Sequence, residues 1–253
     1  MRVVITGAAG LVGGVLREGL SSDLEIAAVD LRRIEGVEST VADMAKGGRK
    51  VTRAFRNADV VVDLAAAPSV STPWEFVYRN NLRATINAFE AAREAGVGRV
   101  VFASSNHVTG MYEQDEPYAR IVRGDYEGID PGGVPLLTAA HAIRPDSPYG
   151  VSKAFGEATA RYYSEEHDIS AICLRIGSCK RSDRPENARE FATLITHADL
   201  VRLVESSIRA AEDLRFGIYY GVSDNKWRFW DIADAREELR YEPQDNAERW
   251  RAD

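Results

Sequence analysis

The sequence of 253 residues contains few of the residues that define several classes of protein. It has two cysteines, Cys173 and Cys179, and four scattered histidines, which form neither a disulfide framework nor the pattern of a metal site. We therefore expect two reduced thiols and no metal. No apolar run approaches the roughly 20 residues that span a bilayer, and the N-terminal sequence lacks a signal-peptide layout. These absences favour a cytoplasmic protein that binds no membrane.

Positive charge is also scarce relative to negative charge. The chain has 32 Lys and Arg against 39 Asp and Glu, which gives a formal net charge of −7. Because nucleic-acid phosphates require a basic face, this balance predicts no nucleic-acid partner. Small-molecule binding depends on local charge and is not affected. The hydrophobic content of 45% is sufficient for a large core in one compact unit.

Apolar, β-branched runs alternate with helical patterns along most of the chain. Such runs predict strands that are buried on both faces, as in parallel sheets. The clearest helical pattern covers residues 74–95 and ends at Gly96. Each parallel connection needs a covering helix, so the alternation predicts an α/β fold with a doubly wound parallel sheet of the Rossmann type. The predicted strands are residues 3–6, 24–29, 60–64, 100–103 and 169–176.

Two regions depart from this alternation. Residues 111–147 are rich in Gly, Pro and charge without a sustained period, and we expect this insertion to be a functional loop, such as a lid, or a disordered one. Near the C-terminus, a strand at residues 216–220 and a helix near residues 231–240 predict a small substrate-binding lobe. We therefore divide the chain into a Rossmann domain of residues 1–176, with the insertion, and a lobe of residues 177–253.

The segment TGAAGLVGG directly follows the first predicted strand and opens a helix. In this context Gly7, Gly10 and Gly13 form a dinucleotide-binding fingerprint. The three glycines allow a tight turn, close approach of the backbone to a pyrophosphate and close packing of the helix. The helix N-terminus, with Leu11 and Val12, directs N–H groups and a positive dipole end at the phosphates.

The second predicted strand leads into Asp30. A carboxylate at this position hydrogen-bonds the adenosine ribose hydroxyls and repels a 2′-phosphate, so it favours NAD over NADP. Arg32 and Arg33 follow closely and would accept a 2′-phosphate in the alternative case. Asp43 is a candidate contact to the adenine, with an ordinary solvated carboxylate as the alternative.

The segment SPYGVSKAFGE places Tyr149 and Lys153 four residues apart at the start of a helix, and therefore on one face. A tyrosine with a pKa of about 10 is a poor base at neutral pH, and a neighbouring ammonium lowers that pKa. Ser104 and Ser105 end a central strand, at the edge where open α/β sheets bind ligands. The combination predicts an acid–base site beside the dinucleotide.

These motifs together resemble the extended short-chain dehydrogenase/reductase family, which includes nucleotide-sugar epimerases and dehydratases. The resemblance covers nearly the whole chain and rests on TGAAGLVG, DLAA at residues 63–66, Asn81, the serines after VFA, and YGVSK. FASSNH, RIGSC at residues 175–179 and EPQDNAE near the end are similar to uronate dehydrogenases. These NAD-dependent enzymes oxidise the anomeric carbon of galacturonate or glucuronate to an aldarolactone.

The resemblance implies roles for individual residues. It makes Tyr149 the base that takes the C1 hydroxyl proton, Ser105 the group that holds the reacting oxygen, and Lys153 the group that lowers the tyrosine pKa and binds the nicotinamide ribose. The cofactor contacts that it implies are Gly7, Gly10, Leu11, Val12, Gly13, Asp30, Asp43, Met44, Leu64, Ala65, Ala66, Asn81, Ser104, Tyr149, Lys153 and Ile176. The substrate contacts that it implies are Ser69, Ser105, Asn106, His107, Tyr149, Ser178 and Arg189.

Two departures from the uronate dehydrogenases leave the substrate open. The interval between Ser105 and Tyr149 is much longer than in those enzymes, and LITHAD replaces an aromatic near the substrate. We expect an anionic sugar as the substrate. Arg189 is the candidate that binds its anionic group, with an ordinary solvated arginine as the alternative. An NAD-dependent glucose-6-phosphate dehydrogenase is the first alternative, and a nucleotide-sugar epimerase or dehydratase, which needs a larger C-terminal lobe, is the second. A non-catalytic NAD-sensing module would not need the Tyr–Lys pair, and assembly into a homo-oligomer is left open.

Overall fold

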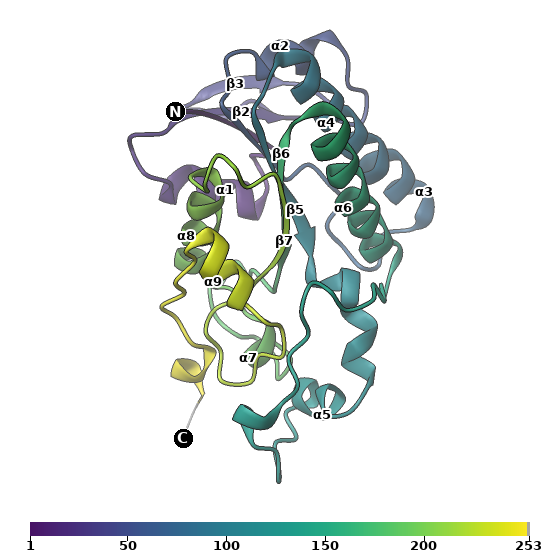
Figure 1. The fold of residues 1–253 in the computed structure, drawn as a ribbon, viewed down its shortest axis with the longest axis vertical. Coiled ribbons are helices and arrows are strands. Elements are labelled where there is room, and N and C mark those ends of the chain that lie inside the picture. The colour runs from purple at the N-terminus through teal and green to yellow at the C-terminus, as the bar shows by residue number, and fades with distance from the viewer. Residues whose placement is uncertain (252–253) are drawn as a thin grey trace.

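A parallel sheet of seven strands forms the centre of the computed structural model, which describes residues 1–251 (Figure 1). The strand order is β3-β2-β1-β4-β5-β6-β7, and every neighbouring pair is parallel. This doubly wound order, with the direction of winding reversed between β1 and β4, confirms the predicted fold class. The strands are β1 (Arg2–Thr6), β2 (Glu25–Asp30), β3 (Glu38–Val41), β4 (Val60–Asp63), β5 (Arg99–Ser105), β6 (Ser170–Ile176) and β7 (Phe216–Gly221).

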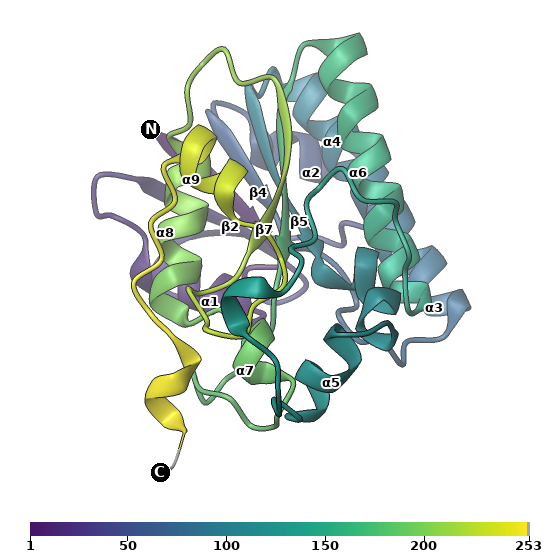
Figure 2. The ribbon, with the colours of Figure 1, turned by 60° about the horizontal axis from the view of Figure 1, so that its bottom comes forward.

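Helices cover both faces of the sheet (Figure 2). On one face α1, α8 and α9 enclose a hydrophobic core that includes Ile5, Leu16 and Leu203. On the other face α2, α4 and α6 enclose a second core that includes Phe89 and Phe102. The bounds are α1 (Leu11–Gly19), α2 (Arg49–Phe55), α4 (Arg83–Ala95), α6 (Pro148–His167), α8 (His197–Ile208) and α9 (Ala233–Leu239).

The helix predicted over residues 74–95 is present but changes its type along its length. It begins as α3 (Trp74–Val77), continues as the π-helix η1 (Tyr78–Leu82) and ends as α4, with Gly96 at a φ of 73°. π-Turns inside helices often occur at functional sites. Here the π-turn carries Asn81, whose side-chain amide reaches the loop that follows β4.

Residues 111–147 contain short regular elements rather than the expected irregular loop. The elements are η2 (Asn106–Gln114), α5 (Tyr118–Arg123) and η3 (Pro131–Gly133), each too short to produce a sustained hydrophobic period. Ile121 in this segment packs with Phe229 and Trp230 of the C-terminal region in a third hydrophobic cluster. The insertion is thus part of a packed core beyond the carboxyl ends of the strands, together with α7 (Glu190–Thr193) and η4 (Ala247–Trp250).

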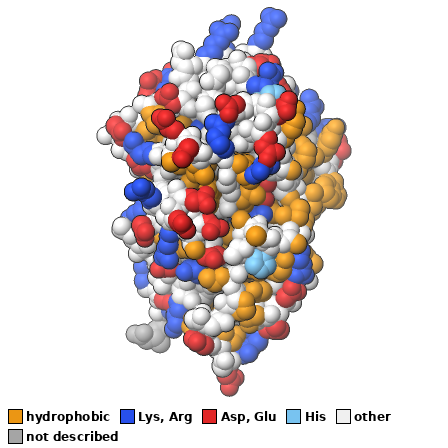
Figure 3. All heavy atoms as spheres, viewed as in Figure 1, with side chains coloured by type: hydrophobic (Ala, Val, Ile, Leu, Met, Phe, Trp, Pro, Cys, Tyr) orange, Lys and Arg blue, Asp and Glu red, His pale blue; other side chains and the backbone are white. Residues whose placement is uncertain are grey.

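Large apolar side chains are exposed in one region of the surface. Figure 3 shows them along the right edge, over α3, where Trp74, Phe76 and Tyr78 are each more than half exposed. Exposed apolar patches of this kind commonly mark interaction surfaces. Association between copies of the chain stays a prediction.

A buried ion pair joins α6 to the sheet. Arg175 in β6 donates two hydrogen bonds, from Nε and Nη2, to the two carboxylate oxygens of Glu157 in α6, both at 2.8 Å. The two side chains are 1% and 5% exposed. The Ser104 hydroxyl donates to Glu157 (2.6 Å), and Arg175 Nη1 donates to the Tyr220 hydroxyl (3.1 Å). One polar network therefore connects β5, β6, β7 and α6.

Substituting Glu157 by Gln should lower the free energy of unfolding by about 3–5 kcal/mol, because the buried Arg175 charge loses its partner. Urea unfolding of the variant and the wild type measures the loss. The matched control is Glu165→Gln on the same helix, whose exposed pair with Arg161 should contribute less than about 1 kcal/mol. Equal losses for the two variants would contradict the role assigned to the buried pair.

Candidate active site

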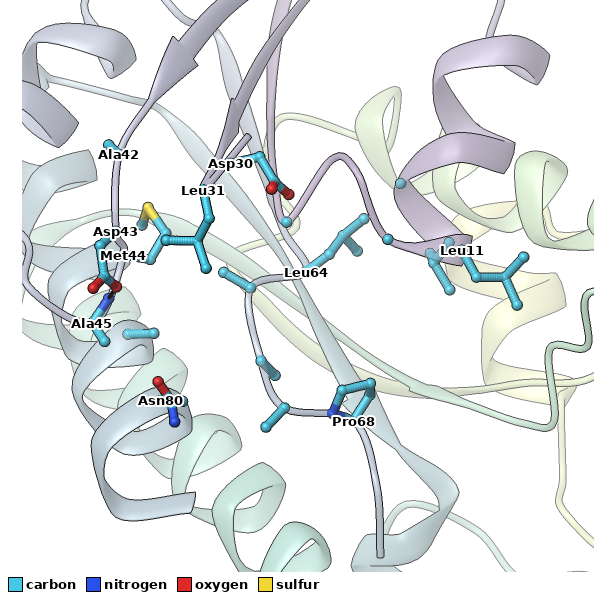
Figure 4. Close-up of a pocket in the computed structure, with 18 of the residues that line it drawn as sticks. Leu11, Asp30, Leu31, Ala42, Asp43, Met44, Ala45, Leu64, Pro68 and Asn80 are labelled. Carbon is cyan, nitrogen blue, oxygen red and sulfur yellow. Dashed lines mark hydrogen bonds between the residues drawn. The ribbon is translucent and has the colours of Figure 1, made fainter. Parts of the chain in front are cut away.

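A cavity of about 600 Å³ lies at the carboxyl ends of β1, β2 and β4 (Figure 4). Both its position and its size suit a dinucleotide. The predicted cofactor contacts that line it are Gly7, Gly10, Leu11, Val12, Gly13, Asp30, Asp43, Met44, Leu64, Ala65 and Ala66. The lining residues that sequence reasoning missed are Leu31, Ala42, Ala45, Ala67, Pro68, Asn80, Ala84 and Cys179. Most of the missed residues are small or apolar and carry no motif that would reveal them.

The glycine-rich turn leaves no room for side chains. Gly7 has a φ of +61°, and a Cβ there would lie 3.0 Å from the Leu64 backbone. A Cβ on Gly13 would lie 2.6 Å from the Cα of Ala8, so α1 packs directly against the turn. The backbone at the start of α1 is thereby kept open to the cavity, as a pyrophosphate requires.

The end of β2 and the turn are held together by Asp30. Its carboxylate accepts hydrogen bonds from the backbone N–H groups of Ala9 (2.9 Å) and Arg32 (3.1 Å). The Arg32 side chain reaches back to the carbonyl oxygen of Ala9 at 3.3 Å. A carboxylate and a guanidinium therefore both lie where the adenosine ribose is expected, and the carboxylate, which lines the cavity, fits a ribose without a 2′-phosphate.

The predicted cofactor residues Asn81, Ser104 and Ile176 do not line the cavity. Asn81 accepts from Ala67 N–H (2.8 Å) and donates to the Ser152 hydroxyl (3.0 Å), so it ties the loop after β4 to α6. The Ser104 hydroxyl donates a hydrogen bond to Glu157, and Ile176 lies beside Ser105 in the sheet.

Tyr149 lies at the start of α6 and is 9% exposed. Burial raises its pKa to about 12, and a side-chain hydrogen bond with Ser105 acts in the opposite direction. Ser105 is the last residue of β5, and its hydroxyl also accepts from His107 N–H at 3.2 Å. The predicted base and the predicted oxygen-holding hydroxyl therefore lie close together.

Lys153 is buried one turn further along α6. Its ammonium donates to the carbonyl oxygen of Ala103 at 2.6 Å and lies 5.6 Å from the centre of the Tyr149 ring. Burial lowers the Lys153 pKa to about 8, against the charge of Asp63, which raises it. Burial is the main influence on the pKa of Tyr149, and a lowering of that pKa by Lys153 stays a prediction.

Two predicted substrate contacts follow Ser105 directly. Asn106 is 2% exposed, and its Nδ2 has no hydrogen-bond partner within residues 1–251. His107 Nδ1 lies 2.6 Å from the carboxylate of Asp146, and the imidazole is 6.0 Å from the Tyr149 ring, centre to centre. Burial opposes the ionisation of Asp146, but its bonds to His107 and Ser147 and the nearby charges outweigh this effect and lower its pKa.

Ser178 and Arg189 come together beyond the end of β6. Arg189 Nη1 donates to the Ser178 hydroxyl at 3.1 Å. Its Nε and Nη2 donate to the carboxylate of Glu113 at 2.5 and 2.7 Å, a contact that sequence reasoning missed. Ser69 follows the cavity residue Pro68 and bonds Ser71 in an exposed loop. Within residues 1–251 no cluster of His, Cys, Asp and Glu is arranged to hold a metal, and no helix there has the length and apolarity to cross a membrane.

The glycine-rich turn, the carboxylate after β2 and the Tyr–Lys pair on α6 define a dinucleotide-binding oxidoreductase of the Tyr–Lys type. Residues 3–199 match the model of the NAD dependent epimerase/dehydratase family. The chain belongs to this family, and its cofactor is NAD.

Three curated relatives extend the comparison to nearly full length. The L-arabinose 1-dehydrogenase (NAD(P)(+)) of Haloferax volcanii is 33% identical, over 97% of this chain and 97% of the relative. The NAD-dependent glucose-6-phosphate dehydrogenase of the same organism is 35% identical, over 97% and 94%. A uronate dehydrogenase of Pseudomonas syringae pv. tomato is 36% identical, over 99% and 84%.

Among solved structures, a mutant of uronate dehydrogenase from Agrobacterium tumefaciens complexed with NAD has a TM-score of 0.82. It is 33% identical, and the match covers 98% of this chain and 86% of that structure. The relatives thus share the fold and the dinucleotide chemistry and differ in the sugar that their names give.

Replacing Asp30 by Ala should lower the preference for NAD over NADP by about tenfold or more, because the carboxylate that repels a 2′-phosphate is lost while Arg32 remains. The measurement is kcat/KM with each dinucleotide at a fixed sugar concentration. Asp43→Ala, which removes a second carboxylate that lines the cavity, serves as the control. A wild-type preference for NADP would show that Arg32 or Arg33 overrides Asp30.

Lys153→Met should raise the free energy of unfolding at pH 7 by up to about 3 kcal/mol, because the folded-state pKa near 8 lies below the ordinary value of 10.5. The folded protein holds the Lys153 proton less tightly than the unfolded chain does. Burial of Lys153 therefore lowers the free energy of unfolding very little above pH 10.5, and lowers it more as the pH falls toward 8. The gain should therefore shrink between pH 7 and pH 10 in denaturant titrations. A gain that is equal at both values, or equal to that of exposed Lys46→Met, would refute this interpretation.

Proposed function

We propose that the protein is an NAD-dependent dehydrogenase that oxidises the anomeric C1 hydroxyl of a monosaccharide to a lactone. The observation that carries the proposal is the meeting of Tyr149 with Ser105 at the carboxyl end of β5, beside a cavity that fits a dinucleotide. The three full-length relatives act on different sugars by name, and one name places the oxidation at position 1. Their common chemistry supports dehydrogenation and leaves the sugar open.

Tyr149 at the start of α6 and Ser105 at the end of β5 have different roles in proton transfer. Tyr149, once ionised, takes the proton of the C1 hydroxyl, and Ser105 holds the same oxygen by a hydrogen bond. The hydride that leaves C1 would be taken up by a bound NAD, whose positive nicotinamide charge would favour the phenolate. This contribution is needed because a pKa near 12 keeps Tyr149 protonated in the free enzyme at neutral pH.

Asn106 and His107 are placed to orient the sugar. The unpartnered Nδ2 of Asn106 is a buried donor, and leaving such a group without an acceptor costs about 1–3 kcal/mol. A sugar hydroxyl or ring oxygen would supply the missing acceptor. His107 donates through Nδ1 to Asp146 in its neutral form, which leaves Nε2 as an acceptor for a sugar hydroxyl.

The resemblance to uronate dehydrogenases leads to a narrower proposal. In it the sugar is anionic, and Ser178 and Arg189 bind its anionic group. The contact between Ser178 and Arg189 supports it. The bond between Arg189 and Glu113 weighs against it, because one of the two edges by which the guanidinium can grip a carboxylate is already in use.

Substituting Tyr149 by Phe should lower kcat by about 100-fold or more, since a positioned base contributes that much, and should change NAD affinity little. NADH absorbance measures turnover on a panel of monosaccharides, and tryptophan fluorescence measures NAD binding. Tyr162→Phe, an exposed position on the same helix, is the control. Retention of more than about a tenth of the wild-type rate would contradict the assigned role.

A further inference from the structure

We propose that Glu113 is a specificity-determining residue that occupies the anion-binding edge of Arg189, so that the sugar oxidised at this site is an uncharged aldose. This inference rests on the proposed function, because it names the sugar class for the same site. Glu113 belongs to none of the motifs in the sequence, and its role follows from its contacts alone.

Every nitrogen of the Arg189 guanidinium has a protein partner. Nε and Nη2 form one of the two edges by which a guanidinium can grip a carboxylate or phosphate with two hydrogen bonds, and both donate to Glu113, at 2.5 and 2.7 Å. The third nitrogen, Nη1, donates to the Ser178 hydroxyl, which is in turn 2.8 Å from the Thr193 hydroxyl. A carboxylate on the sugar would find this edge taken by a carboxylate of the protein, and it would have to share Nη1 with the Ser178 hydroxyl.

Glu113 is held in place by the element that carries it. η2 starts with Asn106 and His107 at the substrate side and reaches Glu113 near its end. Met111 N–H donates to the carbonyl oxygen of Arg144 at 2.9 Å, and the Arg144 guanidinium is paired with Asp115. The Glu113 side chain is only 14% exposed, so its carboxylate is not a solvated group that can turn away freely.

The charge around Arg189 is already balanced toward the negative. Asp146 and Glu190 act on the guanidinium in addition to Glu113. An anionic sugar that displaced Glu113 would leave a largely buried carboxylate without its partner, which is costly. Sugar hydroxyls, in contrast, can donate to these carboxylates and need no free cation.

The wild-type enzyme provides the first test. The value of kcat/KM with NAD is measured on sugars that differ only in the anionic group, namely glucose against glucuronate, glucose against glucose 6-phosphate, and galactose against galacturonate. We expect the neutral sugar of each pair to be preferred by about tenfold or more. Preference for an anionic sugar would overturn the inference while leaving the proposed function intact, whereas no NADH from any sugar would overturn both.

The second test frees the guanidinium. In Glu113→Gln the ratio of kcat/KM for glucuronate to that for glucose should rise by about tenfold or more, because the carboxylate that competes for Arg189 is gone. The matched control is Glu116→Gln in the same segment, whose pair with Arg123 at 3.6 Å is exposed. An unchanged ratio in a folded Glu113→Gln protein, as judged by its thermal midpoint, would overturn the inference.

A double substitution separates the charge of Arg189 from a general loosening of the pocket. In Glu113→Gln/Arg189→Met the gain on glucuronate should disappear, because no guanidinium remains to bind it. A gain that persists in the double variant would show that Glu113 acts by bulk rather than by occupying Arg189. If the single variant does not fold, Glu113→Asp, which keeps the charge on a shorter side chain, should shift the ratio in the same direction.

Discussion

The buried pair of Glu157 and Arg175 is the contact on which the geometry of the site depends. A pair of this kind contributes little net stability compared with apolar side chains of similar volume, because both charges lose their hydration. The pair matters instead because it fixes the position of α6 on the sheet. The carboxylate of Glu157 must meet the guanidinium and the Ser104 hydroxyl together, and only one placement of α6 along β5 and β6 satisfies both. That placement also fixes where Tyr149 meets Ser105.

A second polar contact holds the same helix at the cofactor side. Asn81, in the π-turn, bonds the backbone of Ala67 and the hydroxyl of Ser152, which in turn donates to the carbonyl oxygen of Tyr149. The helix that carries the base is thus tied to the sheet by one network and to the wall of the dinucleotide cavity by another. Hydrogen bonds through α6 therefore connect the base and the strand of the oxygen-holding serine to the wall of the cavity.

The features that could be predicted from the sequence are those with a local signature. The buried strands, the glycine-rich turn and the placement of Tyr149 and Lys153 on one helix each follow from spacing along the chain. β3 was missed because its sequence, ESTV, is an edge strand without an apolar run. The partner of Arg189 was missed for another reason. Glu113 lies 76 residues away along the chain, and no local pattern indicates which distant carboxylate an arginine will meet.

The segment that carries Glu113 leaves the active site and returns to it at the same point. Val108 and Met111, near its start, exchange backbone hydrogen bonds of 2.9 Å with Arg144, near its end. These bonds join the two ends of the segment beside the active site, while its apolar side chains pack into the third hydrophobic cluster. The segment is thus an insertion that is anchored at one point beside the active site. A change within this segment would therefore alter the surroundings of Arg189 while leaving the glycine-rich turn and Tyr149 in place.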